Sequence, residues 1–169
     1  GSGDDEIHMG AGGGDFAYGG ADNDTVFWGP PTPTTARTVD GGTGIDTISG
    51  GGTTFGAGAT FNLGADQYTT GFFTETWANF ENYYNVSATG NETVIGSSGD
   101  NLIQFGSAND GGDGGGGVDV IYGGGGNDIL EGGFVTDNVY GGAGDDTLRV
   151  LAGEFYDNSY GGAGADTLD

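Results

Sequence analysis

A carboxylate recurs at regular spacing through much of the chain. In the clearest run, from Glu92 to Asp146, every ninth residue is acidic except Asn101, and Asp157 and Asp166 follow after eleven and nine residues. Carboxylate oxygens are the ligands that a hard divalent cation such as Ca²⁺ prefers. The spacing therefore predicts a column of metal ligands that is built into a repeat.

The repeat is a glycine-rich nonamer, G1-G2-x3-G4-x5-D6-x7-U8-x9, in which U is apolar. Its sixth position is occupied by Asp5, Asp15, Asp24, Asp46, Glu92, Asn101, Asp110, Asp119, Asp128, Asp137, Asp146, Asp157 and Asp166. Its eighth position is occupied by Ile7, Ala17, Val26, Ile48, Val94, Ile103, Gly112, Ile121, Leu130, Val139, Leu148, Ser159 and Leu168. Eleven of the 19 aspartates stand in this register, which is well beyond coincidence.

Each nonamer predicts one short strand and one tight turn. The x-U-x segment favours a strand with one inward side chain, and glycines in G-G-x-G-x-D supply the positive φ of a turn. Two nonamers then make an 18-residue coil, and stacked coils form parallel ladders about 4.8 Å apart. The apolar column is one residue wide, so it cannot stabilise the fold alone. Turn carbonyls and two aspartates converge between successive coils, which predicts an all-oxygen Ca²⁺ site.

The composition supports a cation-dependent fold. Of 169 residues, 42 are glycine, and 25 acidic residues oppose only Arg37 and Arg149, for a net charge of −23. Such a chain repels nucleic acid and anionic membranes, and without counter-ions it is expected to be disordered. No apolar run is long enough for a membrane span. The chain has no cysteine, and its one histidine, His8, falls at an outward position nine, so zinc is disfavoured.

The nonamer resembles the RTX, or hemolysin-type calcium-binding, repeat. The resemblance covers residues 1–27, 41–49 and 87–169. It implies an all-β parallel β-roll (a β-solenoid) with several Ca²⁺ ions between coils. It further implies a bacterial protein that is exported unfolded by type I secretion and folds in external calcium, hence an extracellular or cell-surface location. Both ends of the chain fall inside the repeat, so we expect a piece of a longer protein.

The resemblance also implies a ligand set for each pair of successive turns. The earlier turn contributes the carbonyls of positions two and four, the later turn those of positions one and three, and both contribute the aspartate. The three sets that this implies are Gly106, Ala108 and Asp110 with Gly123, Gly125 and Asp128; Gly124, Gly126 and Asp128 with Gly141, Ala143 and Asp146; and Gly142, Gly144 and Asp146 with Gly161, Ala163 and Asp166. Asp5, Asp15, Asp24, Asp46 and Asp119 are further expected ligands.

Alternate turns are expected on opposite edges of the roll. We call the edge with Glu92, Asp110, Asp128, Asp146 and Asp166 the first edge, and the edge with Asn101, Asp119, Asp137 and Asp157 the second edge. On the second edge, Val135 and Phe155 stand where glycine belongs. Because branched and aromatic residues resist positive φ, we expect these two turns to bind Ca²⁺ poorly and calcium to run mainly along the first edge.

An aromatic face accompanies the second edge. Tyr122, Tyr140 and Tyr160 each occupy position nine after a second-edge turn and should project outward one coil apart; Phe134, Phe155 and Tyr156 lie nearby. One interpretation is that the stacked rings stabilise the sheet. The alternative is a surface for a carbohydrate or protein partner, or for self-association.

Two interruptions divide the array. Residues 1–52 hold the N-terminal repeats with a Pro/Thr-rich loop at 28–40, and residues 87–169 form the C-terminal roll. Residues 53–86 hold nine of the 20 aromatic residues. We expect this segment to pack as a cap over an open end or side of the roll, with a ligand pocket among its aromatics as the alternative.

The sequence contains no convincing catalytic constellation. The one candidate acid/base group, Asp66, Glu75 and Glu81, lies in the aromatic segment. We therefore expect a non-enzymatic structural or secretion module of a larger secreted or surface protein. The alternative is a non-catalytic module of a secreted protease, lipase or polysaccharide-modifying enzyme, with the aromatic face as its binding surface.

Overall fold

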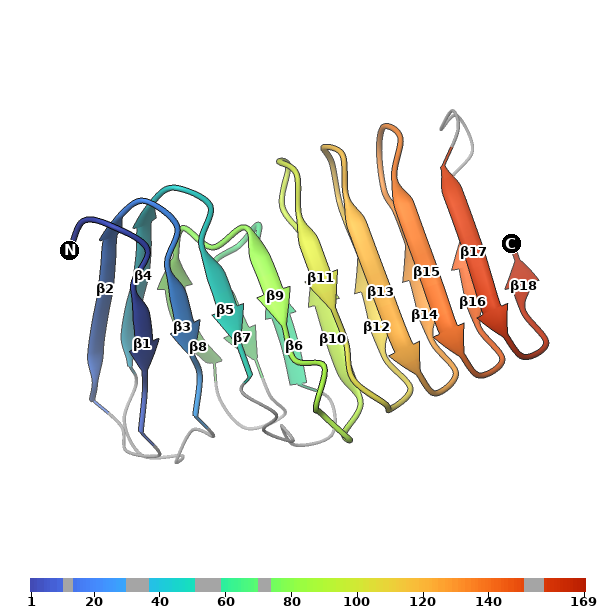
Figure 1. Cartoon of the computed structure of the whole chain (residues 1–169), viewed down its shortest axis with the longest axis horizontal. Helices are drawn as coiled ribbons and strands as arrows, with labels where there is room; N and C mark the ends of the chain where they lie inside the picture. Colours follow the sequence, from blue (N-terminus) through green and yellow to red (C-terminus); the bar gives the residue numbers. More distant parts are fainter. Residues whose placement is uncertain (11–13, 30–36, 51–58, 70–73, 151–156) are drawn as a thin grey trace.

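The molecule is a solenoid of two facing β-sheets. The structure, a computed structural model, describes the chain outside five segments, which are residues 11–13, 30–36, 51–58, 70–73 and 151–156; of residues 74–77 it describes the main chain alone. The described residues form 18 strands, and the chain passes from one sheet to the other after each strand except at β6, β7 and β8, which lie in the same sheet (Figure 1). None of the described residues belongs to a helix that is long and apolar enough to span a membrane. The predicted parallel β-roll is confirmed.

One sheet has eight strands, all paired in parallel. In spatial order they are β1 (Glu6–His8), β3 (Thr25–Phe27), β5 (Thr47–Ser49), β9 (Asn82–Tyr84), β11 (Leu102–Gln104), β13 (Val120–Gly125), β15 (Asn138–Ala143) and β17 (Asn158–Ala163). Equivalent positions of successive coils face each other, so Tyr122 pairs with Tyr140 and Tyr140 with Tyr160. This register is what the repeat predicts.

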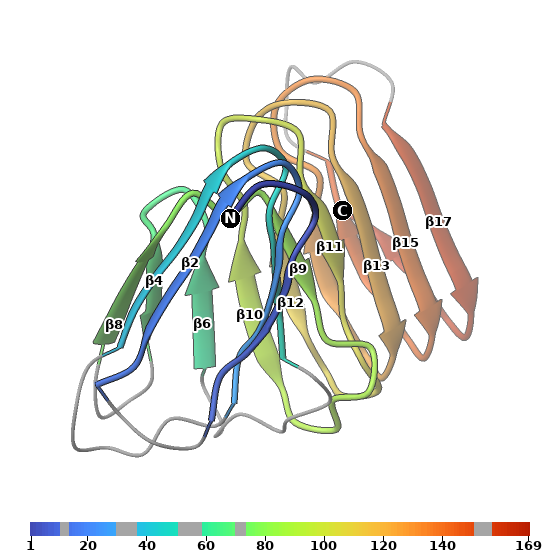
Figure 2. The same cartoon turned by 60° about the vertical axis from the view of Figure 1, so that its left-hand side comes forward.

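The other sheet has ten strands. In spatial order they are β18 (Thr167–Leu168), β16 (Thr147–Arg149), β14 (Ile129–Glu131), β12 (Gly111–Asp113), β10 (Glu92–Ile95), β6 (Ala59–Asn62), β7 (Gln67–Thr69), β8 (Thr74–Ala78), β4 (Thr38–Thr43) and β2 (Phe16–Ala21). Strand β7 is antiparallel to both neighbours, and every other pairing is parallel. Figure 2 shows the two sheets as separate layers that turns join at both edges.

The core is a narrow column of inward side chains. Position-eight residues such as Val26, Ile48, Ile121 and Leu130 are fully buried. In most coils each strand contributes one such residue, because flanking positions seven and nine point outward. The turns that join the strands lie along the two edges, at the bottom (first edge) and top (second edge) of Figure 1.

The described part of the aromatic segment is an insertion in the middle of the roll and does not cap an open end. Strands β6, β7 and β8 fill the ten-stranded sheet between β10 and β4, and β9 joins β5 to β11 in the other sheet (Figure 1). Phe61 is tilted against Tyr68 and Tyr83, with ring centroids 4.7 and 4.6 Å apart. All three side chains are buried in the core. Phe72 and Phe73 lie outside the described residues.

In one irregular nonamer, a large buried side chain compensates for a missing one. Gly112 stands at the inward position eight of β12, where it supplies no side chain. Phe105, which replaces the first glycine of the preceding turn, is 2% exposed. A Cβ on Gly112 would lie 3.0 Å from the Phe105 ring and 3.1 Å from Leu130. Phe105 therefore fills the volume that Gly112 leaves.

Candidate metal centre

A ladder of aspartates runs along the first edge. Each backbone N–H at position six donates to the Oδ1 atom of the position-six aspartate one coil later. Asp110 donates to Asp128 over 2.8 Å and Asp128 to Asp146 over 2.9 Å. Glu92 begins this ladder and Asp166 ends it. The nine-residue phase thus places the predicted first-edge residues in one column.

An equivalent ladder runs along the second edge through both halves of the roll. Asp5 donates to Asp24 and Asp24 to Asp46, each over 2.8 Å, and Asp46 donates to Glu81 over 2.7 Å. The ladder resumes at Asn101. From there it continues through Asp119, Asp137 and Asp157. The sequence did not assign the N-terminal aspartates to an edge, because intervals of 19, 22 and 35 residues hide their common phase.

The second oxygen of these carboxylates is buried without a hydrogen bond. This holds for Oδ2 of Asp24, Asp46, Asp110, Asp119, Asp128, Asp146 and Asp157. Burying an ionised oxygen without a partner is costly, and buried charges are normally paired or bound to metal. The regular recurrence of the same unsatisfied atom indicates a common missing partner of positive charge.

The first glycine of each turn makes room beside that oxygen. A Cβ on Gly123 would collide with Oδ2 of Asp128 and with the carbonyl oxygen of Gly141, one coil later. The same relation holds for Gly141 with Asp146 and Gly161. An aspartate oxygen and a carbonyl oxygen therefore converge on one space that only glycine leaves open.

The second and fourth glycines stack on carbonyls of the preceding coil. Gly124 and Gly126 have φ angles of 97° and 103°, and Gly142 and Gly144 have 117° and 136°. A Cβ on Gly142 would collide with the carbonyl oxygen of Gly124, and one on Gly144 with that of Gly126. These carbonyls point toward the following coil. Positions two and four therefore need glycine for both backbone conformation and space.

The donor set suits calcium. Two aspartates and several main-chain carbonyls supply oxygen only, as Ca²⁺ requires with its 6–8 ligands. Among the described residues, no three acidic, histidine or cysteine side chains form a metal-binding group, which follows if the main chain supplies most ligands. The carbonyls of Ala143 and Ala163 also accept hydrogen bonds of 2.8 Å from Gly126 and Gly144, and a carbonyl oxygen has a second lone pair for a cation.

Burial disfavours the ionised form of these carboxylates. It raises the pKa of Asp128 and Asp119 to about 7 and that of Asp110 to about 6, although a backbone N–H opposes the rise in each case. Burial likewise raises the pKa of Asp46 and Asp146. Neighbouring aspartates add to the pKa rise at Asp119 and Asp128. A cation in the column would oppose both effects.

Comparison with known families agrees with this geometry. A family model of the RTX calcium-binding nonapeptide repeat matches residues 1–27, 38–53, 87–113, 106–139, 113–148, 136–154 and 156–169. The chain belongs to the RTX calcium-binding repeat family. It is therefore a calcium-binding structural module of stacked RTX repeats. Among curated proteins, no sequence matches the chain.

The RTX turns on the second edge differ from expectation in one respect. Val135 adopts a φ of 92°, the left-handed conformation that its branched side chain disfavours. Its turn keeps the main-chain ladder, because Phe134 donates to the carbonyl of Gly115 over 2.8 Å. Weak calcium binding at this turn stays a prediction. Phe155 and Tyr156 lie outside the described residues.

Arg37 is a site residue that the sequence analysis missed. Arg37 immediately precedes β4, as Asp15 immediately precedes β2. Because Phe16 pairs with Thr38, Arg37 stands in register with Asp15 one coil later. Its guanidinium donates to the carbonyl of Gly29 over 3.0 Å and lies 4.3 Å from the centre of the Trp28 ring. A side-chain cation thus stands in the column where an RTX turn has an acidic ligand. An arginine among 25 acidic residues was the available signal.

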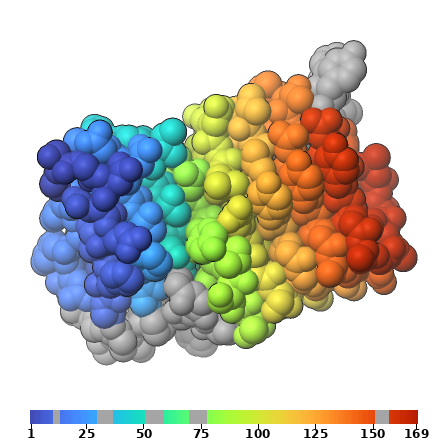
Figure 3. Space-filling model, viewed as in Figure 1, coloured from blue at the N-terminus to red at the C-terminus, as the bar shows by residue number. Residues whose placement is uncertain are grey.

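The outward tyrosines of the RTX roll form a stacked ladder. Tyr122 and Tyr140 are 4.8 Å apart with planes inclined by 9°, and Tyr140 and Tyr160 are 5.1 Å apart at 7°. The sheet that carries them, with β13, β15 and β17, faces the viewer in Figure 3. Because stacked rings cover one another's faces, the ladder exposes mainly ring edges and hydroxyl groups to solvent. His8 is similarly exposed and stacks on Phe27 at 4.3 Å.

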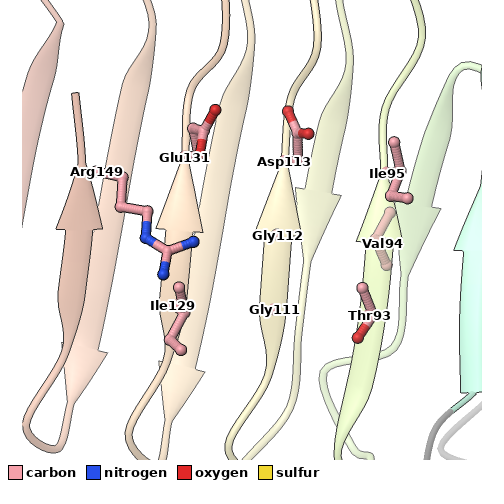
Figure 4. Close-up of a pocket in the computed structure, with 9 residues that line it drawn as sticks. All are labelled: Thr93, Val94, Ile95, Gly111, Gly112, Asp113, Ile129, Glu131 and Arg149. Atoms are coloured by element: carbon pink, nitrogen blue, oxygen red, sulfur yellow. The ribbon is translucent and has the colours of Figure 1, made fainter. Parts of the chain in front are cut away.

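The opposite sheet carries a groove of about 340 Å³ on its outer surface (Figure 4). It lies over β12, where Gly111 supplies no outward side chain, between Thr93 of β10 and Ile129 of β14. Glu131 and Arg149 line one side. The groove follows from the missing outward side chain of Gly111.

The acidic residues that the sequence singled out for catalysis have other surroundings. Glu81 accepts the N–H of Asp46 and belongs to the second-edge ladder. Burial raises the pKa of Asp66, with Asp40 as a neighbouring charge. The side chain of Glu75 lies outside the described residues.

Proposed function

We propose that this module folds when it binds several Ca²⁺ ions outside the cell and serves as a structural or secretion domain of a larger secreted or surface protein. The observation that carries the proposal is the repeated Oδ2 atom, buried without a hydrogen bond beside a glycine carbonyl. In this account Asp128 and Asp146 each serve the spaces on both sides of their coil, and Asp110 serves the space toward Asp128.

The mechanism is electrostatic. Carboxylates one coil apart repel each other, and burial removes their hydration, so the closed roll is unfavourable until a cation offsets both costs. Calcium binding energy then becomes folding energy. Extracellular calcium modules have Kd values of roughly 10⁻⁴–10⁻³ M. Such affinities would keep the chain unfolded in a low-calcium cytoplasm and folded after export.

The module itself is proposed to be non-catalytic. An enzyme elsewhere in a parent chain is compatible with this role, and the tyrosine ladder then becomes the candidate surface for a carbohydrate or protein partner. Tyr160 supports that second candidate, because it is 55% exposed at the end of the stack.

Circular dichroism of the whole chain tests the proposal. We expect a strong β-sheet signal in millimolar calcium and loss of most of it in excess chelator, with magnesium unable to restore it. The same spectrum in calcium and in chelator would contradict the proposal.

A matched pair of variants tests the ligand assignment. Asp128→Asn removes one of the unsatisfied carboxylates and should raise the calcium concentration needed for folding by about tenfold or more, equivalent to the 1.5–3 kcal/mol of a charged contact. Asp145→Asn removes an exposed carboxylate from a position where Asn109 and Asn127 stand in neighbouring turns, and should leave the calcium midpoint unchanged. Equal shifts in both variants would contradict the assignment.

A further inference from the structure

The first-edge ladder begins at a residue that does not present an unsatisfied oxygen. Glu92 occupies position six, and both of its carboxylate oxygens accept hydrogen bonds from neutral side chains. Tyr83 donates to Oε2 and Asn85 to Oε1, each over 2.7 Å. In the next coil, Oδ2 of Asp110 has no such partner. Protein donors thus occupy the oxygens of Glu92 that calcium would bind.

The turn that follows Glu92 also departs from the repeat. The carbonyl of Ala88, at position two of the Glu92 turn, accepts the N–H of Ser107 over 2.9 Å, as the carbonyl of Gly106 accepts that of Gly125 in the next coil, so the difference lies at position one. The following turn begins with Phe105 in place of the first glycine, and that side chain is buried in the core. The residues between these two turns therefore do not fit a calcium ion.

The second-edge ladder changes at the same coil. Asn101 is the neutral member of its column. Its Oδ1 accepts the N–H of Ser97 over 2.7 Å, and its Nδ2 donates to the carbonyl of Glu81. The amide supplies its own donor where the other turns hold a carboxylate. Both ladders are thus completed by protein groups in the middle of the roll.

The middle also holds four of the largest fully buried side chains of the core. Phe61, Tyr68, Tyr83 and Phe105 are each 2% exposed or less. The Phe61 ring packs against Tyr68 and Tyr83, and Tyr83 packs against Phe105. The C-terminal coils have single aliphatic residues instead, such as Ile121. Aromatic residues bury far more apolar area each than such a residue does.

We propose that residues 59–69 and 80–105 form a calcium-independent core, which stays folded when calcium is removed and templates the outer coils when calcium returns. The inference rests on the proposed calcium-driven folding of those outer coils. A preformed sheet edge on each side removes the unfavourable nucleation step from the stacking of the next coil.

Hydrogen exchange of the whole chain, followed by mass spectrometry, tests the inference. In excess chelator, amides of the central segments, such as Leu63 and Asn85, should exchange at least tenfold more slowly than Gly126 and Gly144 of the outer coils. In millimolar calcium both groups should be protected. Uniformly fast exchange in chelator with protection in calcium would overturn the core and leave calcium-driven folding intact. Uniform protection in both conditions would instead overturn calcium-driven folding.

A neighbouring pair of tyrosines provides the control. Tyr83→Phe keeps the buried ring and removes the donor to Glu92, so central exchange in chelator should accelerate about tenfold or more while protection in calcium persists. Tyr84→Phe changes an outward tyrosine that is 43% exposed and should leave exchange unchanged. If the two variants behave alike in chelator, the Tyr83–Glu92 contact does not replace calcium and the inference fails.

Discussion

Neighbouring positions of one turn differ in how strictly they require glycine. Gly124, at position two, has a φ of 97°, and its missing Cβ leaves room for the carbonyl of Gly106. At position three, the nearest heavy atom to a Cβ on Gly125 would be 3.7 Å away, and Ala143 stands at the same place one coil later. The turn therefore requires glycine at position two and tolerates alanine at position three.

Gly124→Ala should destabilise the calcium-loaded module by about 1–3 kcal/mol, because the substitution forces a side chain into a left-handed conformation and against a carbonyl. Gly125→Ala should change stability by less than about 0.5 kcal/mol. Urea unfolding in constant calcium measures both. Equal effects would show that the turn lacks the positional requirement.

At the scale of the element, hydrogen bonds join successive coils, and one nonamer compensates for its own irregularity. The exposed position-five residues form an additional ladder, in which Asn127 accepts the N–H of Asp145 over 3.0 Å and Asp145 accepts that of Ala165 over 2.8 Å. This ladder joins successive coils, whereas the Phe105–Gly112 exchange lies within one nonamer and is completed by Leu130 of the next coil. Stability is thus distributed between neighbouring coils, as in other repeat proteins.

Phe105→Ala should cost about 3–5 kcal/mol, because it empties a buried aromatic site. Gly112→Val should also destabilise alone, since its side chain would meet the Phe105 ring. The double variant should be more stable than the sum of the two single effects predicts, because each change accommodates the other. Strict additivity in denaturant unfolding would refute the exchange of volume.

The tyrosine ladder gives a graded prediction. Tyr140 stacks on two rings and Tyr160 on one, and each aromatic pair is worth about 0.5–1.5 kcal/mol. Tyr140→Ser should therefore destabilise roughly twice as much as Tyr160→Ser in thermal unfolding with calcium. Unchanged stability in both variants would remove the stabilising role and favour the partner surface, for which binding to soluble polysaccharides can be measured.

At the scale of the whole molecule, the repeat made most of the roll predictable. A nine-residue phase is local in sequence, so it identified the strands, the alternating edges and the C-terminal aspartate column from residues such as Asp110 and Asp128. The position of the central segment was not predictable. Phe61, Tyr68 and Tyr83 pack by shape among residues far apart in sequence, and no period marks that arrangement. Arg37 was missed because its partners are main-chain carbonyls.

The buried aspartates of the two columns also predict that, without calcium, the fold is more stable at acidic than at neutral pH. The folded-state pKa of Asp128 is about 7 and that of Asp110 about 6, against about 3.9 for an unfolded aspartate. Between these values the folded state holds more protons, so the free energy of unfolding falls as pH rises from about 4 to about 7. In chelator, β-sheet content should therefore be greater at pH 5 than at pH 7.5. With calcium bound, acid should weaken the fold, because protons compete for the same oxygens. A chelator titration without pH dependence would contradict the burial of these carboxylates.

The central claim is that calcium bound between coils stabilises the roll. The most direct test is the free energy of unfolding of the whole chain in urea, measured at buffered free calcium concentrations from micromolar to tens of millimolar. Each bound ion should add about 1.4 kcal/mol per tenfold increase in calcium above its Kd, so several ions should give a slope of several times that value. A free energy of unfolding that does not change with calcium would contradict the account.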